Sequence, residues 1–120
     1  KGKGAITKNM VERIYVEGVR LYNGEIGRRE AKEIVNKATS MDMGSCNDYY
    51  TVLGALLDGV EYHRTINAFA TEYFLESMER DFGVERSKRA ANAVKDHAKY
   101  YATLGHGHQR MIEKLAVKYS

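Results

Sequence analysis

The stretch TINAFATEYFLESMERDF, residues 65–82, decides the fold class. Its mainly apolar stripe recurs at intervals of three and four residues: Ile66, Phe69, Ala70, Tyr73, Phe74, Ser77 and Met78. That spacing places the stripe on one face of an α-helix, because the helix repeats every 3.6 residues. Gly83 follows directly and is a typical helix end. The segment therefore predicts a long amphipathic helix around which the rest of the chain packs.

The same periodicity extends outward from this segment in both directions. It predicts further helices near residues 10–22, 28–38, 45–57, 87–104 and 108–119. Thr7 or Asn9 can cap the first of them, and Gly24 can end it. No segment alternates with the period of two that a strand requires, and proline is absent. We expect an all-α fold, a compact bundle of five to six helices in one domain over residues 7–120, preceded by a flexible tail at residues 1–6.

The composition is that of a globular chain, with 43% hydrophobic and 29% charged residues in 120. Cys46 is the single cysteine and no secretory signal is visible, which favours the reducing cytoplasm. No apolar run is long enough to predict a membrane span. Residues 83–120 carry eight Lys/Arg and three Asp/Glu, a net +5, which leaves −2 for residues 1–82. This asymmetry predicts an anionic partner, the alternative being a solvated, lysine-rich helix surface.

Residues 27–57 read as helix, turn and helix, the order of a DNA-binding helix-turn-helix. In that interpretation one set of side chains holds phosphates, namely Arg28, Arg29 and Lys32. The second helix would direct another set at base edges, namely Ser45, Asn47 and Tyr50. The expected turn, residues 39–45, is longer than the usual three or four residues. The alternative is a plain helical hairpin.

A second basic region spans the last third of the chain. Arg86, Lys88 and Arg89 begin one predicted helix, and His108 and Arg110 begin the next. Glycines at 105 and 107 free the intervening backbone, so amides at the start of the last helix can face an anion. We expect phosphate contacts here, against the alternative of a flexible polar loop.

Signals for catalysis and for metal binding are weak. His106 and His108 are two imidazoles, but a metal site needs a third and usually a fourth ligand, and nothing in the spacing draws in His63 or His97. Motifs such as GxSxG, the phosphate-binding loop, HExxH and CxxC are absent from the sequence. The sequence therefore predicts no enzyme activity in this chain alone, no metal, no cofactor and no small-molecule substrate.

Three stretches carry a resemblance: GSCNDYYTVLGALLDG at residues 44–59, HRTINAFATEYFLESM at residues 63–78 and LGHGHQR at residues 104–110. Together they resemble helical accessory domains of bacterial restriction endonucleases of the HNH and McrA-like kind. The resemblance implies a module that engages DNA and leaves cleavage to another domain, because the HNH nuclease pattern is not visible in this chain. The alternative is a protein-interaction or dimerisation module, suggested by tyrosines left over once a six-helix core is filled: Tyr49, Tyr50, Tyr100 and Tyr101.

Overall fold

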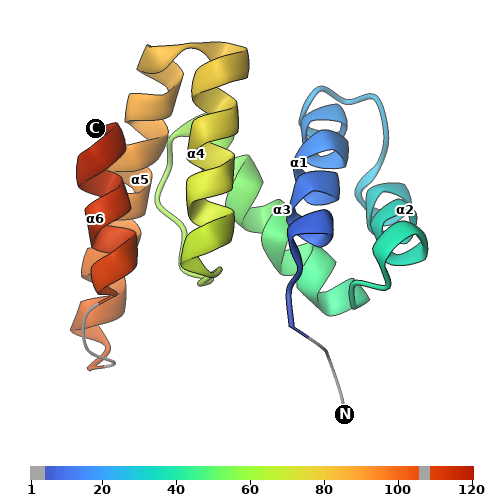
Figure 1. The fold of residues 1–120 in the computed structure, drawn as a ribbon, viewed down its shortest axis with the longest axis horizontal. Coiled ribbons are helices and arrows are strands. Elements are labelled where there is room, and N and C mark those ends of the chain that lie inside the picture. Colours follow the sequence, from blue (N-terminus) through green and yellow to red (C-terminus); the bar gives the residue numbers. More distant parts are fainter. Residues whose placement is uncertain (1–4, 106–108) are drawn as a thin grey trace. The chain divides into compact units, whose positions relative to one another are not determined.

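A computed structural model of the protein describes residues 5–105 and 109–120, and within them every regular element is an α-helix (Figure 1). The elements are α1 (Lys8–Tyr22), α2 (Arg28–Thr39), α3 (Met43–Asp58), α4 (Ala68–Phe82), α5 (Val84–Thr103) and α6 (Arg110–Tyr119). The predicted all-α fold of five to six helices is confirmed. Across these same residues, no helix combines the length and the hydropathy that a membrane crossing requires.

Capping side chains set where the helices begin. Thr7 caps α1 as predicted, because its hydroxyl accepts from the amide of Met10 at 3.2 Å. Helix α4 begins at Ala68, three residues later than predicted, because Asn67 is the residue that caps it. The Asn67 Oδ1 accepts from the amide of Ala70 at 2.8 Å. The Thr65 hydroxyl bonds instead to His97 of α5.

The chain divides within α3 into two compact units, Lys1–Gly54 and Ala55–Ser120. The expectation of a single domain over residues 7–120 stays a prediction, and each unit is described by itself.

In the first unit, α1 packs closely on its neighbours. Val11 and Ile14 of α1 and Ala31 and Val35 of α2 have no exposed surface. Gly18 of α1 is buried, and a side chain at this position would overlap Leu53 of α3. The absence of a β-carbon therefore sets how near the backbone of α1 lies to α3.

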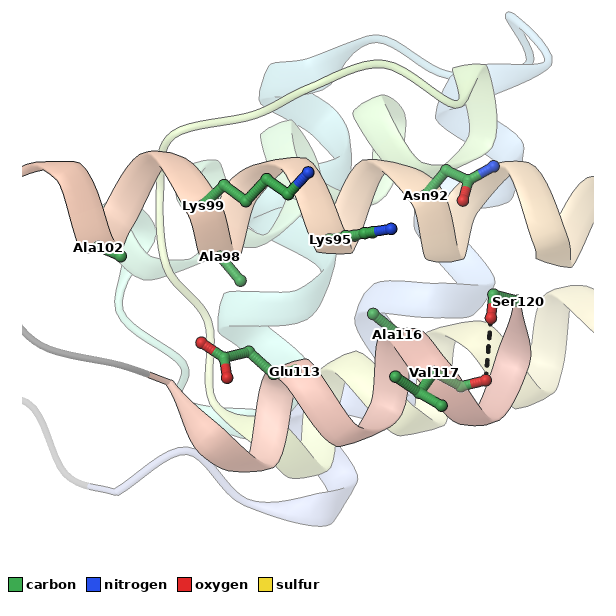
Figure 2. A pocket seen from close by; sticks show the side chains of 9 residues that line it. All are labelled: Asn92, Lys95, Ala98, Lys99, Ala102, Glu113, Ala116, Val117 and Ser120. Carbon is green, nitrogen blue, oxygen red and sulfur yellow. Dashed lines mark hydrogen bonds between the residues drawn. The ribbon is translucent and has the colours of Figure 1, made fainter.

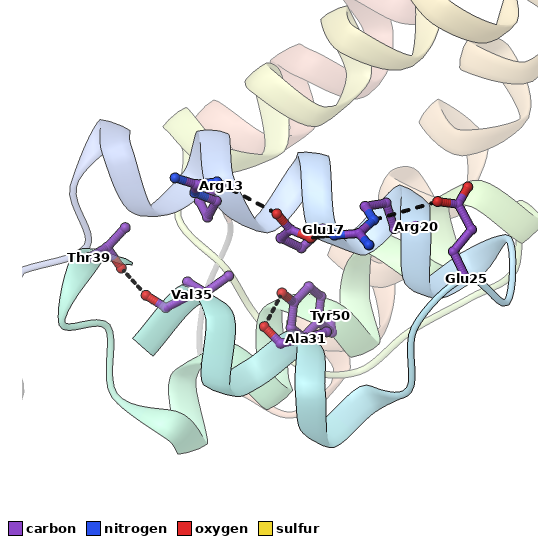
Figure 3. A network of polar contacts seen from close by, with 8 residues as sticks. All are labelled: Arg13, Glu17, Arg20, Glu25, Ala31, Val35, Thr39 and Tyr50. Carbon is purple, nitrogen blue, oxygen red and sulfur yellow. Dashed lines mark hydrogen bonds and ion pairs between the residues drawn. The ribbon is translucent and has the colours of Figure 1, made fainter. Parts of the chain in front are cut away.

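A buried carboxylate organises one side of α1 (Figure 3). Glu17 is 5% exposed, and Arg20 Nη1 donates to its Oε1 at 2.8 Å while Arg13 Nη1 lies 3.6 Å from Oε2. Arg20 Nε also lies 3.5 Å from Glu25 Oε1 beyond the end of the helix. Two guanidinium groups thus compensate the cost of removing one carboxylate from water.

In the second unit, α4, α5 and α6 pack on one another, and Gly83 alone connects α4 to α5. Gly83 has φ +96°, a region that L side chains rarely adopt, so the abrupt reversal between the two helices depends on glycine. The core is formed by fully buried side chains of α4 and α5: Phe74, Leu75, Met78, Ala90, Ala91 and Val94.

The connection before α4 is held to α5 by a buried histidine. His97 is 1% exposed, its ring stacks on Tyr62 with centroids 4.5 Å apart, and its Nδ1 lies 2.8 Å from the Tyr62 carbonyl oxygen. A carbonyl only accepts, so Nδ1 carries the proton and Nε2 accepts from the Thr65 hydroxyl at 3.0 Å. Burial lowers the pKa of His97, which keeps the imidazole neutral in this arrangement.

Candidate functional site

The α2–α3 hairpin has a tighter turn than the sequence predicted. Three residues, 40–42, connect the two helices, and Ser40 at the end of α2 adopts a left-handed conformation with φ 67°. Asp42 Oδ2 accepts from the amide of Ser45 at 3.0 Å, so Asp42 caps α3. The turn therefore has the length that is usual in a helix-turn-helix. The longer turn predicted from the sequence had been an argument against that motif.

Two side chains predicted to contact DNA instead contact each other. Arg28 Nη1 donates to the backbone oxygen of Asn47, to its Oδ1 and to the hydroxyl of Thr51, each at 3.2 Å. The start of α2 is thus fastened to the first half of α3. Reading of an adenine edge by Asn47 would require Arg28 to release its amide oxygen.

The structure corrects the prediction for Tyr50. Its side chain is 2% exposed, and its hydroxyl donates to the carbonyl oxygen of Ala31 at 2.8 Å (Figure 3). Burial raises the pKa of Tyr50, so the hydroxyl stays protonated as this donor. Tyr50 joins α3 to α2 inside the core and has no surface with which to meet a base.

The other predicted residues of the hairpin lie nearer the surface. Arg29 is exposed and pairs with Glu33 one turn along α2, with Nε 3.5 Å from Oε2. Lys32 and Ser45 are half-buried. Cys46, between the predicted reading residues, is fully buried, and burial raises the pKa of its thiol to about 11. In this state the thiol is neutral and a weak nucleophile.

In the second basic region, Arg86 and Arg89 bind the end of another helix. Arg86 Nε donates to the carbonyl oxygen of Leu57 at 3.0 Å, and Arg89 Nη2 donates to that of Asp58 at 3.1 Å. These carbonyls belong to the last turn of α3, where helix oxygens lack intrahelical partners. Two cations at a helix C-terminus also oppose the partial negative charge there. Both arginines thus have a structural role that the sequence did not predict.

Lys88 and Arg110 are exposed, as a contact with a large partner requires. His108 lies outside the described residues, as do His106 and Gly107, so the predicted anion contact at the loop stays a prediction. In the described part of the chain no three His, Cys, Asp or Glu side chains gather where they could hold a metal ion.

A groove between α5 and α6 was not predicted from the sequence. It has a volume of about 400 Å³ and is lined by Asn92, Lys95, Ala98, Lys99 and Ala102 of α5, and by Glu113, Ala116, Val117 and Ser120 at the end of the chain (Figure 2). Its floor is made by short side chains, because three of these residues are alanines. Val117 is apolar and 76% exposed.

The two sides of the groove carry opposite charge. Lys95 and Lys99 extend from α5, and Glu113 lies across from Ala98 and Lys99 on α6 (Figure 2). Lys88 and Asn92 continue the exposed stripe of α5 toward the start of the helix, at helical spacing from Lys95. The groove therefore combines an apolar floor with one cationic side and one anionic group.

The sequence contained a partial signal for this groove. Polar side chains of α5 recur at intervals of three and four residues, which predicts that they share one face of the helix: Lys88, Asn92, Lys95 and Lys99. The alanines did not predict a groove, because alanine is the strongest helix former and is common wherever two helices approach closely.

When the chain was compared with protein-family profiles, with curated proteins and with solved structures, no match was found in any of the three comparisons.

Proposed function

We propose that this chain is a binding module that holds another protein chain in the groove between α5 and α6. The observation that carries the proposal is the apolar floor of the groove, made by Ala98, Ala102, Ala116 and the exposed Val117, at the surface of the protein. Covering such a floor removes apolar surface from water, which favours association. Short side chains also allow a partner backbone to approach closely.

Charge and shape together favour a protein over a nucleic acid as the partner. A protein–DNA interface is polar and strongly positive, whereas this groove is apolar along its floor and flanked by both signs of charge. Four arginine and asparagine side chains expected to face DNA are bonded within the chain, namely Arg28, Asn47, Arg86 and Arg89. A helix lying in a groove is a common mode of protein recognition.

Site-specific photo-crosslinking tests the proposal in the cells that make the protein. A photoreactive amino acid replaces Val117, which is exposed and lines the groove. The matched control carries the same group at Val84, which is 51% exposed and does not line the groove. We expect light-dependent adducts from position 117 and not from position 84. Equal labelling at both positions, or none at position 117, would contradict the proposal.

A second candidate is DNA binding through phosphates, favoured by the exposed stripe of Lys88, Lys95 and Lys99 on α5 and by Arg110 at the start of α6. The resemblance to accessory domains of HNH and McrA-like endonucleases points the same way. Binding would be driven by the release of counterions, so affinity would fall steeply with salt. Of the predicted set in the first unit, Arg29 and Lys32 would add phosphate contacts.

Fluorescence anisotropy with a labelled duplex tests this second candidate. The variant Lys88→Gln, Lys95→Gln, Lys99→Gln is expected to weaken binding on all sequences and to lower the salt slope by about one unit for each lysine that neutralises a phosphate. The control Lys8→Gln, Lys37→Gln removes two exposed lysines of the first unit. DNA binding is excluded if the unaltered chain fails to bind duplex at low salt.

A further inference from the structure

We infer that the occupant of the α5–α6 groove is an acidic amphipathic helix of a partner protein. The inference rests on the proposed function, because it names the chemistry of the chain that the same groove holds. It combines two observations: the apolar floor of the groove and the two cations on its α5 side, Lys95 and Lys99. Each observation specifies one face of the partner.

The two lysines on the α5 side are available to a partner. Both side chains are exposed, and among the residues that the structure describes no carboxylate forms an ion pair with either of them. By contrast, Lys118 of α6 already donates to Glu72 at 2.8 Å, and Glu113 across the groove also has an interaction within the chain. The unmatched charge of the groove is therefore positive, which predicts carboxylates on the partner.

The spacing of these cations suits a helix. Lys95 and Lys99 lie four residues apart on α5, so they share one face and are separated by about 6 Å along the helix axis. Acidic residues at positions i and i+4 of a helix that lies along α5 have the same separation, so both ion pairs form together. Exposed ion pairs contribute little affinity, so the charges select the partner while apolar contacts hold it.

The apolar surface extends along the whole groove (Figure 2). Ala98 and Ala102 form it at one end, and Ala116 and Val117 form it at the other, where Val117 lies across from Lys95. Alanine side chains are short, so about 400 Å³ above this surface is open to solvent. Large apolar side chains of the partner, such as leucines at both ends of the groove, fill this volume and leave water.

The groove favours a helical partner over an extended one. Its lining on α5 extends from Asn92 to Ala102, a length of roughly 15 Å, which about ten residues of helix span. An extended segment would place backbone amides and carbonyls over alanine side chains, which offer no hydrogen-bond partner. A helix bonds these groups within itself and presents only side chains to the groove.

Synthetic peptides test this chemistry directly. The acidic peptide is a helix of about 18 residues with leucines along one face and glutamates beside them at i and i+4, and in the basic peptide lysines replace the glutamates. Fluorescence anisotropy is expected to show that the full chain binds the acidic peptide at least about tenfold more tightly than the basic one. A scrambled acidic peptide of the same composition, without an apolar face, should also bind at least about tenfold more weakly.

Charge reversal in the groove should exchange this preference. The variant Lys95→Glu, Lys99→Glu should bind the acidic peptide at least about tenfold more weakly and should bind the basic peptide instead. The control Lys37→Glu, Lys114→Glu changes net charge equally at exposed positions that do not line the groove, and should keep the original preference. Circular dichroism verifies that both variants keep their helices. Equal binding of the two peptides by the unaltered chain, or an exchange of preference in the control, would overturn the inference.

The crosslinking experiment separates failure of this inference from failure of the proposed function. The expected result is an acidic amphipathic sequence at the site of the adduct from position 117, and loss of that adduct in Lys95→Glu, Lys99→Glu. Adducts that this variant leaves unchanged, or adducts of two copies of this chain, would overturn the acidic partner while supporting a protein in the groove. The absence of adducts at position 117 would remove the proposed function itself.

Duplex DNA provides the remaining comparison, because the same lysines would contact phosphates. If the unaltered chain binds duplex but not the acidic peptide, and Lys95→Glu, Lys99→Glu abolishes duplex binding, the inference is overturned in favour of DNA. Binding of the acidic peptide that duplex does not displace would support the partner helix.

Discussion

The first unit and the α5–α6 pair differ in how completely the space between their helices is filled. In the first unit, Gly18 brings α1 so close to α3 that a single methyl group would overlap Leu53, and the Tyr50 hydroxyl reaches α2. Between α5 and α6, alanines leave about 400 Å³ open to solvent. The comparison teaches that small residues at a helix contact have two opposite outcomes: they draw helices together or leave a space between them. Substitution with larger residues distinguishes the two.

The largest effect is expected for Gly18→Val. The added side chain would overlap Leu53, which is buried and cannot move away freely, so the free energy of unfolding should fall by about 2–3 kcal/mol. Urea denaturation followed by circular dichroism measures the change. The control is Gly54→Ala in α3, where a β-carbon meets nothing within 4 Å and should stabilise the helix by about 0.5–1 kcal/mol. A decrease of similar size in both variants would show that the overlap at Gly18 is not the cause.

Tyr50→Phe should have the next largest effect, because it removes a buried hydrogen bond and keeps the ring. The carbonyl of Ala31 loses its 2.8 Å donor, and the free energy of unfolding should fall by about 1 kcal/mol. Tyr100→Phe, at a half-buried tyrosine whose ring stacks on His63, should change stability by less than about 0.5 kcal/mol. Thermal unfolding of both variants gives the comparison, and equal midpoints would argue that the Tyr50 hydroxyl contributes nothing.

A pH dependence sharpens the contrast between the units, since all four histidines follow residue 54. His97 has a pKa lowered mainly by burial, with His63 lowering it further and the Tyr62 carbonyl and Glu61 raising it. The unfolded chain therefore takes up the proton first. Stability should be constant above about pH 6.5 and decrease as pH falls below it, until the folded state protonates as well.

Hydrogen exchange resolved by residue measures this effect. Between about pH 7.5 and about pH 5.5, corrected for the intrinsic exchange rate, protection should decrease in α5 and in residues 59–67. His97→Gln should be less stable at all pH values but should lose this slope, whereas His63→Gln should keep it. A slope that persists in His97→Gln would assign the effect to another group.

The smallest effect on stability is expected for Ala102→Leu. This side chain is added where space exists, so the free energy of unfolding should stay within about 0.5 kcal/mol of the original. The same substitution should reduce crosslinking from position 117, because leucine occupies the groove. Ala91→Leu enlarges a fully buried alanine of the same helix and should cost about 1–3 kcal/mol. If Ala102→Leu costs as much as Ala91→Leu, the groove closes in solution and the contrast between the two regions fails.

Local sequence patterns predicted the helices well, because helix periodicity and caps are encoded within a few residues. Helix α2 begins at the predicted Arg28, and Thr7 caps α1 as expected. The start of α3 was placed two residues late, since Asp42 and Ser45 are both good caps and their sequence does not rank them. Met111 is apolar but 62% exposed, because it lies in the first turn of α6 at the edge of the buried stripe of that helix.

Local sequence patterns did not predict the hydrogen-bond partners of the candidate site residues. Arg28 bonds to a residue 19 positions away, and Arg86 to one 29 positions away. Such partners are determined by how the helices pack. An arginine that donates to carbonyl oxygens at a helix end therefore cannot be distinguished by its sequence from one that binds a phosphate. Tyr50 stands on the apolar face with Leu53 and Leu57, and that spacing alone argued for burial.

The bonds from Arg86 and Arg89 to the last turn of α3 also bear on how this chain should be cut for expression. A fragment that begins at Ala55, where the second unit begins, retains the carbonyl oxygens of Leu57 and Asp58. A fragment trimmed to Gly59, the first residue after that helix, discards both acceptors while keeping both guanidinium groups. A boundary placed in the loop that follows α3 would thus remove the hydrogen bonds that Arg86 and Arg89 of α5 donate to α3. The better boundary is Ala55, which lies inside α3 and four residues before the loop begins at Gly59.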